Sequence, residues 1–104
     1  KLARIKVAVF ALLKNKPELV AKAHEVFSSL RKEFMCEFDD NGNIGKRYRR
    51  QDEIGTPFCV VVDFDTLGEN PDLLNTVTVR NRDTGEQTRL PIADLSNFIK
   101  NAIQ

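Results

Sequence analysis

The sequence contains few of the residues on which catalytic, redox and metal sites depend. The sequence has a single histidine, His24, and no Cys–His or Ser–His–Asp set is evident around it. His24 lies outside the apolar stripe of its segment, so we expect it to be a surface residue. The two cysteines, Cys36 and Cys59, form no CxxC motif, and no GxGxxG or Walker loop is present. These absences predict a binding module without catalytic residues, a metal site or a cofactor.

Long apolar segments are also missing. No run approaches the roughly eighteen apolar residues of a membrane span, and the chain has no signal peptide. The 41% hydrophobic and 30% charged residues are typical of a soluble globular domain, and two thiols without a disulfide framework suit a reducing compartment. We therefore expect a cytoplasmic protein with free, largely buried thiols and no membrane association.

The length of 104 residues predicts one domain, residues 1–104. The chain starts at Lys1 and its only methionine is Met35, so we expect a fragment of a longer chain. The formal net charge is only +1, so any attraction to nucleic acid must come from the distribution of charge.

The apolar pattern predicts alternating strands and helices. The first half of the chain predicts a buried strand at Ile5–Leu13, a helix opened by Pro17 with an apolar stripe to Phe34, and a strand at Met35–Phe38. A helix capped by Asn43 is predicted from Ile44 to about Ile54. The second half predicts strands at Phe58–Phe64, Thr76–Arg82 and Glu86–Leu90, and a helix after Pro91 with an apolar stripe to Ile103. The order β-α-β-α-β-β-β-α predicts an α/β fold. We expect a single domain whose five-stranded mixed sheet is flanked by three helices.

The short helix from Ile44 carries a basic cluster with an aromatic ring inside it. The cluster consists of Lys46, Arg47, Tyr48, Arg49 and Arg50. Cations suit a phosphate backbone and the ring suits a stacked base, so the cluster is typical of RNA binding. A solvated helix face followed by a core strand is the plainer alternative. Only Ile44, Tyr48 and Ile54 offer apolar surface for docking, so we expect this helix to be mostly exposed.

The strand that begins at Phe58, a predicted core residue, ends in carboxylates. Asp63 and Asp65 are two positions apart, so on a strand they would share a face and could hold a metal or act as acid and base. Acidic residues commonly end a strand without either role, so we assign neither to this pair.

Three segments carry a family resemblance: KLARIKVAVFALLKNKPELV, GKRYRRQDEIGTPFCVVVDFD and TVTVRNRDTGEQTRLPI. They are similar to the C-terminal anticodon-binding domain of glycyl-tRNA synthetases, which are class II enzymes, and the resemblance covers essentially the whole chain. Arg4 and Ala11 depart from it, because proline is expected at both positions. The family's domain is a five-stranded mixed sheet with three helices, the same order that the residues predict.

The resemblance implies that the domain binds the anticodon loop of glycine tRNA, so that a catalytic domain outside this sequence joins glycine to that tRNA. ATP and magnesium are implied only for the catalytic domain. The implied partners are therefore glycine tRNA and the catalytic domain of a parent enzyme, which we expect to be a homodimer. A protein-interaction or dimerisation module of the same fold, without RNA specificity, is the alternative.

The resemblance also suggests which residues contact RNA. Glycine anticodons carry two cytosines, whose exocyclic amine needs an acceptor and whose O2/N3 edge accepts from arginine. We predict that the anticodon bases are contacted by Arg80, Arg82, Asp63, Asp65 and Glu86, and that the phosphates are bound by the basic cluster. Within that cluster, Tyr48 either stacks on a base or packs inward. For Arg80 and Arg82 the alternative is a surface pair with Glu86, which would contribute little.

Overall fold

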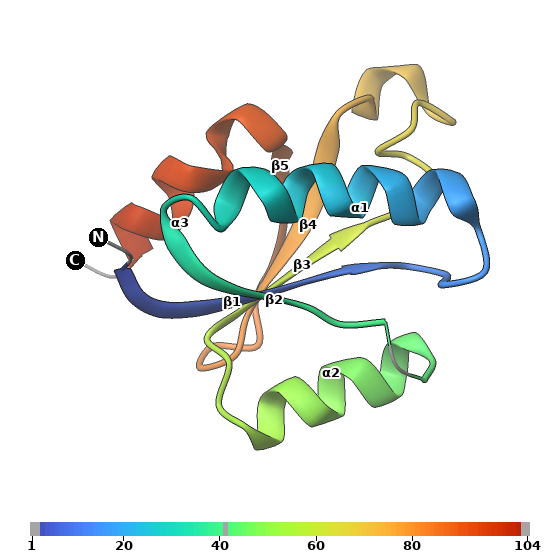
Figure 1. The fold of residues 1–104 in the computed structure, drawn as a ribbon. Helices are drawn as coiled ribbons and strands as arrows, with labels where there is room; N and C mark the ends of the chain where they lie inside the picture. Colours follow the sequence, from blue (N-terminus) through green and yellow to red (C-terminus); the bar gives the residue numbers. More distant parts are fainter. Residues whose placement is uncertain (1–2, 41, 103–104) are drawn as a thin grey trace.

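The computed structural model describes residues 3–40 and 42–102, which form a five-stranded mixed sheet with helices on both faces (Figure 1). The elements in chain order are β1 (Ala3–Ala11), α1 (Pro17–Leu30), β2 (Phe34–Phe38), α2 (Ile44–Glu53), β3 (Phe58–Val62), the 3-10 helix η1 (Pro71–Leu73), β4 (Thr76–Asn81), β5 (Gln87–Pro91), the 3-10 helix η2 (Ile92–Asp94) and α3 (Leu95–Ala102). The strand order is β2-β1-β3-β4-β5, in which β1 pairs parallel with β2 and β3 while β4 pairs antiparallel with β3 and β5. The predicted α/β class and mixed sheet are confirmed.

The central strands β1 and β3 are buried on both faces, as their continuous apolar runs predict. Val7 and Val9 of β1 face the larger core under α1 and α3, whereas Ala8 and Phe10 face a smaller core under α2. Phe58, at the start of β3, is 3% exposed and belongs to the larger core. In Figure 1, α1 and α3 lie above the sheet and α2 lies below it.

Helix α1 has the predicted apolar stripe but ends earlier than its sequence suggests. Leu30 is its last residue, and Phe34 is buried as the first residue of β2. The extension of the stripe to Phe34 was therefore wrong, because an apolar residue four positions beyond Leu30 fits the helical period whether or not the helix continues. His24 is exposed and stacks on Phe38, with ring centroids 4.0 Å apart, so its prediction as a surface residue is confirmed.

Other boundaries also differ from the sequence prediction; strand β1, for example, ends at Ala11 and not at Leu13. Strand β3 ends at Val62, because the amide and hydroxyl of Thr66 both donate to Asp63 Oδ1 at 3.1 Å and turn the chain. After Pro91 the chain first forms η2, and α3 begins only at Leu95. Ile103, the last residue of the predicted stripe, lies outside the described residues.

Both thiols are free, with Cys59 buried and Cys36 partly buried. None of the helices in the described ranges combines the length and apolar character that crossing a membrane would require.

Candidate nucleic-acid interface

Helix α2 docks on the sheet through two buried polar side chains and through Ile44 and Tyr48, which pack against the smaller core. Its two buried residues are Arg47 and Gln51, whereas Ile54 is 55% exposed. The Arg47 guanidinium donates to the carbonyls of Ala11, at 2.5 Å, and Leu12, at 3.0 Å. Arg47 is only 1% exposed and its guanidinium is bonded to the end of β1, so it is not placed to reach a phosphate, which corrects its assignment to phosphate binding.

Gln51 extends this polar docking to β2 and the residue after it. Its Nε2 donates to Glu37 Oε2 at 2.6 Å and to Asp39 Oδ2 at 2.8 Å, while its Oε1 accepts from the Thr56 hydroxyl at 2.6 Å. Arg50 forms an ion pair with the same Asp39, whose side chain is 1% exposed, and this contact raises the pKa of Arg50. One edge of α2 is thus tied to β2, and the Arg50 charge already has an internal partner.

Lys46 and Arg49 are the members of the basic cluster that remain free to bind phosphate. Both are exposed, and within residues 3–40 and 42–102 neither forms an ion pair. They lie three positions apart on α2, so they occupy neighbouring points on its outer surface. The phosphate role predicted for the whole cluster is therefore available to these two residues.

Tyr48 packs inward, which is one of the two roles that the sequence left open. Its ring meets the Phe10 ring edge to face, with centroids 5.2 Å apart and an interplanar angle of 79°. Burial of the phenol raises the pKa of Tyr48 to about 12. On its outer side the Arg80 guanidinium carbon lies 5.1 Å from the centroid of the Tyr48 ring. The tyrosine thus supports an arginine that was predicted to contact a base.

Arg80 pairs with a carboxylate on α2 and not with Glu86. Its Nη1 and Nη2 donate to Asp52 Oδ1 and Oδ2 at 2.9 and 3.1 Å, a bidentate pair that raises the pKa of Arg80. Arg82 donates from Nε to the Asp52 carbonyl at 3.1 Å and from Nη1 to Asp83 Oδ1 at 3.3 Å. Glu86 is exposed on the same β4–β5 hairpin.

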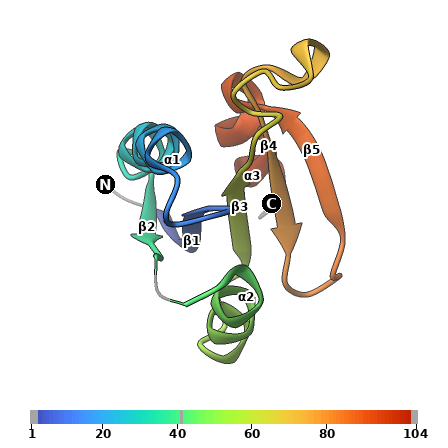
Figure 2. The same ribbon diagram turned by 90° about the vertical axis from the view of Figure 1, so that its right-hand side faces the viewer.

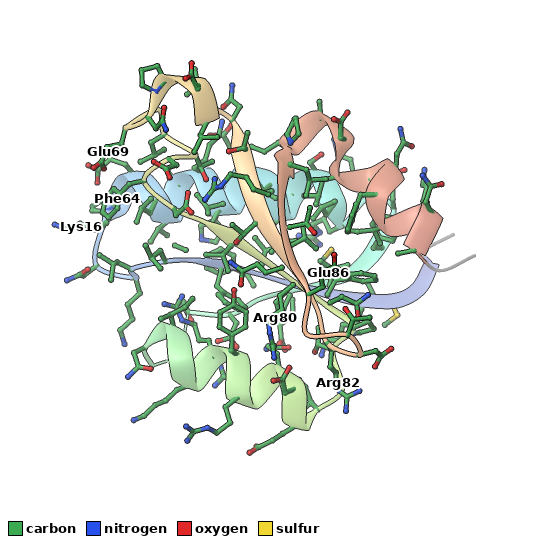
Figure 3. The ribbon with its side chains drawn as sticks, turned by 180° about the vertical axis from the view of Figure 1, so that it is seen from behind. Lys16, Phe64, Glu69, Arg80, Arg82 and Glu86 are labelled. Atoms are coloured by element: carbon green, nitrogen blue, oxygen red, sulfur yellow. The ribbon has the colours of Figure 1, made fainter. Side chains whose placement is uncertain are left out.

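We call Asp52, Arg80 and Arg82, which are joined by hydrogen bonds, the hairpin cluster. Figure 3 shows Arg80 between α2 and the β4–β5 hairpin, with Arg82 near the end of the helix. Sequence reasoning missed Asp52, because its partner Arg80 lies twenty-eight positions away and no periodicity links the two. The only signal available was its place in the acidic segment that follows the basic cluster.

Asp63 and Asp65 lie in the turn after β3, so their prediction on one face of a strand was wrong. Asp63 forms an ion pair with Arg89 of β5, and Arg89 also donates to the Thr76 hydroxyl at 2.9 Å. Burial opposes ionisation of Asp63, but the hydrogen bonds from Arg89 and Thr66 hold its pKa below the usual range. Asp65 is partly buried. The described part of the chain contains no cluster of three or more residues suited to a metal ion.

The two groups of polar side chains share one face of the sheet. Along β4, Thr76, Thr78 and Arg80 alternate with the buried Val77 and Val79. Helix α2 lies below β1 and β3, while β4 and β5 extend beside it (Figure 2). The α2 face of β4 and β5 is thus a partly exposed polar surface, with the hairpin cluster at one end and Asp63 and Arg89 at the other.

A pocket of about 410 Å³ opens at the other end of α2, beside the end of β1. Leu12, Leu13 and Ile44 form apolar walls, and the exposed Lys14 also lines the pocket.

The chain is similar to known proteins over nearly all of its length. Residues 6–102 match the family model described as "Anticodon binding domain". The chain is 52% identical over 103 residues to a glycine–tRNA ligase of Bacillus cereus (strain ZK / E33L), an alignment that covers 99% of this chain and 21% of the relative. It is 54% identical over 99 residues to that of Corynebacterium efficiens, covering 95% of this chain and 20% of the relative.

The resemblance read from the sequence is thus confirmed. The chain spans about one fifth of the length of the curated relatives it matches. Because the family model covers nearly all of its residues, this protein belongs to the family of anticodon-binding domains.

Proposed function

We propose that this domain binds the anticodon loop of glycine tRNA and positions that tRNA for aminoacylation by another part of the parent enzyme. The observation that carries the proposal is the position of Arg80 and Arg82, which β4 and the hairpin hold beside the exposed surface of α2. The family match and the similarity to glycine–tRNA ligases support tRNA as the ligand.

Base recognition on this surface would depend on pairs of donors and acceptors. An arginine can donate to the O2/N3 edge of cytosine, and a carboxylate can accept from its exocyclic amine. Uracil presents an oxygen in place of that amine. This oxygen and the carboxylate are both hydrogen-bond acceptors, so they would face each other without a hydrogen bond. Arg80, Arg82 and Glu86 offer this combination at the hairpin, and Asp63 and Asp65 offer further acceptors at the opposite end of β4.

Phosphate binding would come from the outer surface of α2. Lys46 and Arg49 are exposed, so their charges can neutralise phosphates without breaking an internal ion pair. Contacts of this kind release counterions and make affinity fall as salt concentration rises. The remaining partners in this proposal are the catalytic domain of the parent enzyme and, in a homodimer, a second copy of that enzyme.

The test is binding of the domain to two anticodon stem-loops at low salt, followed by fluorescence anisotropy. One RNA carries the glycine anticodon, and the other has both of its cytosines changed to uracil. We expect tighter binding to the cytosine loop, with affinities for both loops falling as salt rises. Equal affinity for the two loops would contradict base recognition by this domain. RNA-independent self-association without RNA binding would favour a dimerisation module.

A further inference from the structure

Asp52, on the last turn of α2, contacts both arginines that the proposed function assigns to the anticodon bases. Its carboxylate binds Arg80 through two hydrogen bonds of 2.9 and 3.1 Å, and its backbone carbonyl accepts from Arg82 Nε at 3.1 Å. A single residue of the helix therefore binds two guanidinium groups of the hairpin.

These contacts restrict the arginine side chains strongly. The bidentate pair fixes the plane of the Arg80 guanidinium, and the Tyr48 ring 5.1 Å away supports one side of it. A long side chain held in one geometry loses less freedom when a ligand binds. A geometrically defined donor also discriminates better between two bases than a mobile one.

Asp52 itself is held by a rigid support. The residue before it, Gln51, is fully buried and donates to Glu37 and Asp39. The amide of Gly55 donates to the same Asp52 carbonyl at 3.2 Å, in a turn that Gly55 allows with a φ of 80°. The carboxylate is therefore carried by a helix end that is fixed to β2 on one side and reaches β4 on the other.

We propose that Asp52 is a positioning residue for anticodon recognition, which holds Arg80 and Arg82 in the orientation in which they contact bases. This inference rests on the proposed function and adds a residue that acts through the two arginines. Loss of the carboxylate frees Arg80 but keeps the backbone carbonyl that binds Arg82, so it is expected to lower selectivity for cytosine through Arg80 while leaving phosphate binding intact.

The experiment compares Asp52→Ala with Glu53→Ala in binding to the cytosine and uracil stem-loops. Glu53 is the exposed neighbour of Asp52, so both variants remove one negative charge from the same helix end. For Asp52→Ala we expect the ratio of the two affinities to fall about tenfold, with the salt dependence unchanged. Glu53→Ala is expected to keep the wild-type ratio. Asp52→Glu, which restores a carboxylate, is expected to recover part of the preference.

A double-mutant cycle tests whether Asp52 acts through Arg80. We expect Asp52→Ala combined with Arg80→Ala to lose no more selectivity than Arg80→Ala alone, because the two changes remove one interaction. Asp52→Asn is nearly isosteric with the wild-type side chain but lacks the negative charge. A melting curve for each variant shows whether a loss of selectivity comes from lost positioning or from unfolding of α2.

The outcomes distinguish this inference from the proposed function. If the wild-type domain prefers the cytosine loop and a folded Asp52→Ala variant keeps this preference, the inference is overturned but the proposed function is not. An equal loss in Glu53→Ala would also overturn it. A wild-type domain without any preference would overturn both the inference and the proposed function.

Discussion

Gln51 of α2 donates a buried hydrogen bond of 2.8 Å to Asp39, the residue that follows β2. Asp39 is 3% exposed and Gln51 is fully buried, so this contact lies inside the fold although both residues are polar. It accompanies the Arg47 bonds to the end of β1, and together these contacts attach α2 to the sheet. The helix that carries the candidate RNA-binding residues therefore depends on buried polar contacts as well as on the packing of Tyr48 against Phe10.

The first prediction concerns the stability of this core. Gln51→Ala removes a donor from two carboxylates and an acceptor from Thr56, so buried polar groups lose partners. We expect the free energy of unfolding to fall by about 1–3 kcal/mol, measured by urea denaturation. Gln87→Ala, at an exposed position on β5, is the control and is expected to change stability by less than about 0.5 kcal/mol. Equal effects of the two substitutions would argue against polar docking of α2.

The second prediction separates two arginines of the basic cluster. Arg47 is buried and bonded to β1 and the residue after it, whereas Arg49 is exposed two positions further along the helix. Arg47→Met is expected to lower the free energy of unfolding by about 2 kcal/mol or more, because the carbonyls of Ala11 and Leu12 lose their donor.

Arg49→Met is expected to leave stability nearly unchanged and to weaken binding to all stem-loops alike, with the slope of log affinity against log salt reduced by about 1. Denaturation and salt-dependent binding of both variants check this contrast. Loss of RNA affinity in a fully folded Arg47→Met variant, with no loss in Arg49→Met, would contradict these assignments.

The third prediction concerns stability at acid pH. The pKa of Asp63 is lowered in the folded state, so the unfolded chain takes up the proton at a higher pH than the folded chain does. The stability that Asp63 contributes is therefore present above the unfolded pKa and is lost as pH falls through the folded pKa.

Asp63→Asn is accordingly expected to lose stability at pH 7 and to show a smaller further loss on acidification below pH of about 4. Thermal denaturation at several pH values measures this difference. Asp65→Asn is the control, because no described residue donates a hydrogen bond to its carboxylate. A steeper acid loss in Asp63→Asn than in the wild type would contradict the sign of the effect.

The fourth prediction concerns the two thiols. Burial raises the pKa of Cys59 to about 12 and that of Cys36 to about 11, so little of either thiol is the reactive thiolate at neutral pH. We expect iodoacetamide to modify the folded domain slowly at pH 8 and the urea-unfolded domain rapidly, as followed by mass spectrometry. Rapid modification of Cys59 in the folded domain would contradict its burial in β3.

The sequence predicts the sheet and helices well because their burial follows simple periodicities. The continuous apolar runs of β1 and β3 correspond to strands that are buried on both faces. The alternation of β4 corresponds to a strand that is buried on one face only. The end of α1 and the end of β3 were misplaced. At Phe34 and Phe64 an apolar residue continues the local pattern, while the chain direction is set by turns such as the Asp63–Thr66 contact.

The candidate site was less predictable because its contacts join residues far apart in the sequence. Arg47 and Arg49 look alike in a basic run, and only the docking of α2 buries the first and exposes the second. Arg80 and Arg82 stand out on the alternating strand, but their common partner Asp52 becomes apparent only when α2 is placed beside the hairpin.

The central claim is that RNA binds on the α2 side of the β4–β5 hairpin, and amide chemical shifts test it most directly. The domain, labelled with ¹⁵N, would be titrated with the glycine anticodon stem-loop at low salt. We predict that the largest shift changes fall on the outer surface of α2, around Arg49 and Asp52, and on the hairpin from Arg80 to Glu86. Changes concentrated on α1 and α3, with the hairpin unaffected, would contradict the account.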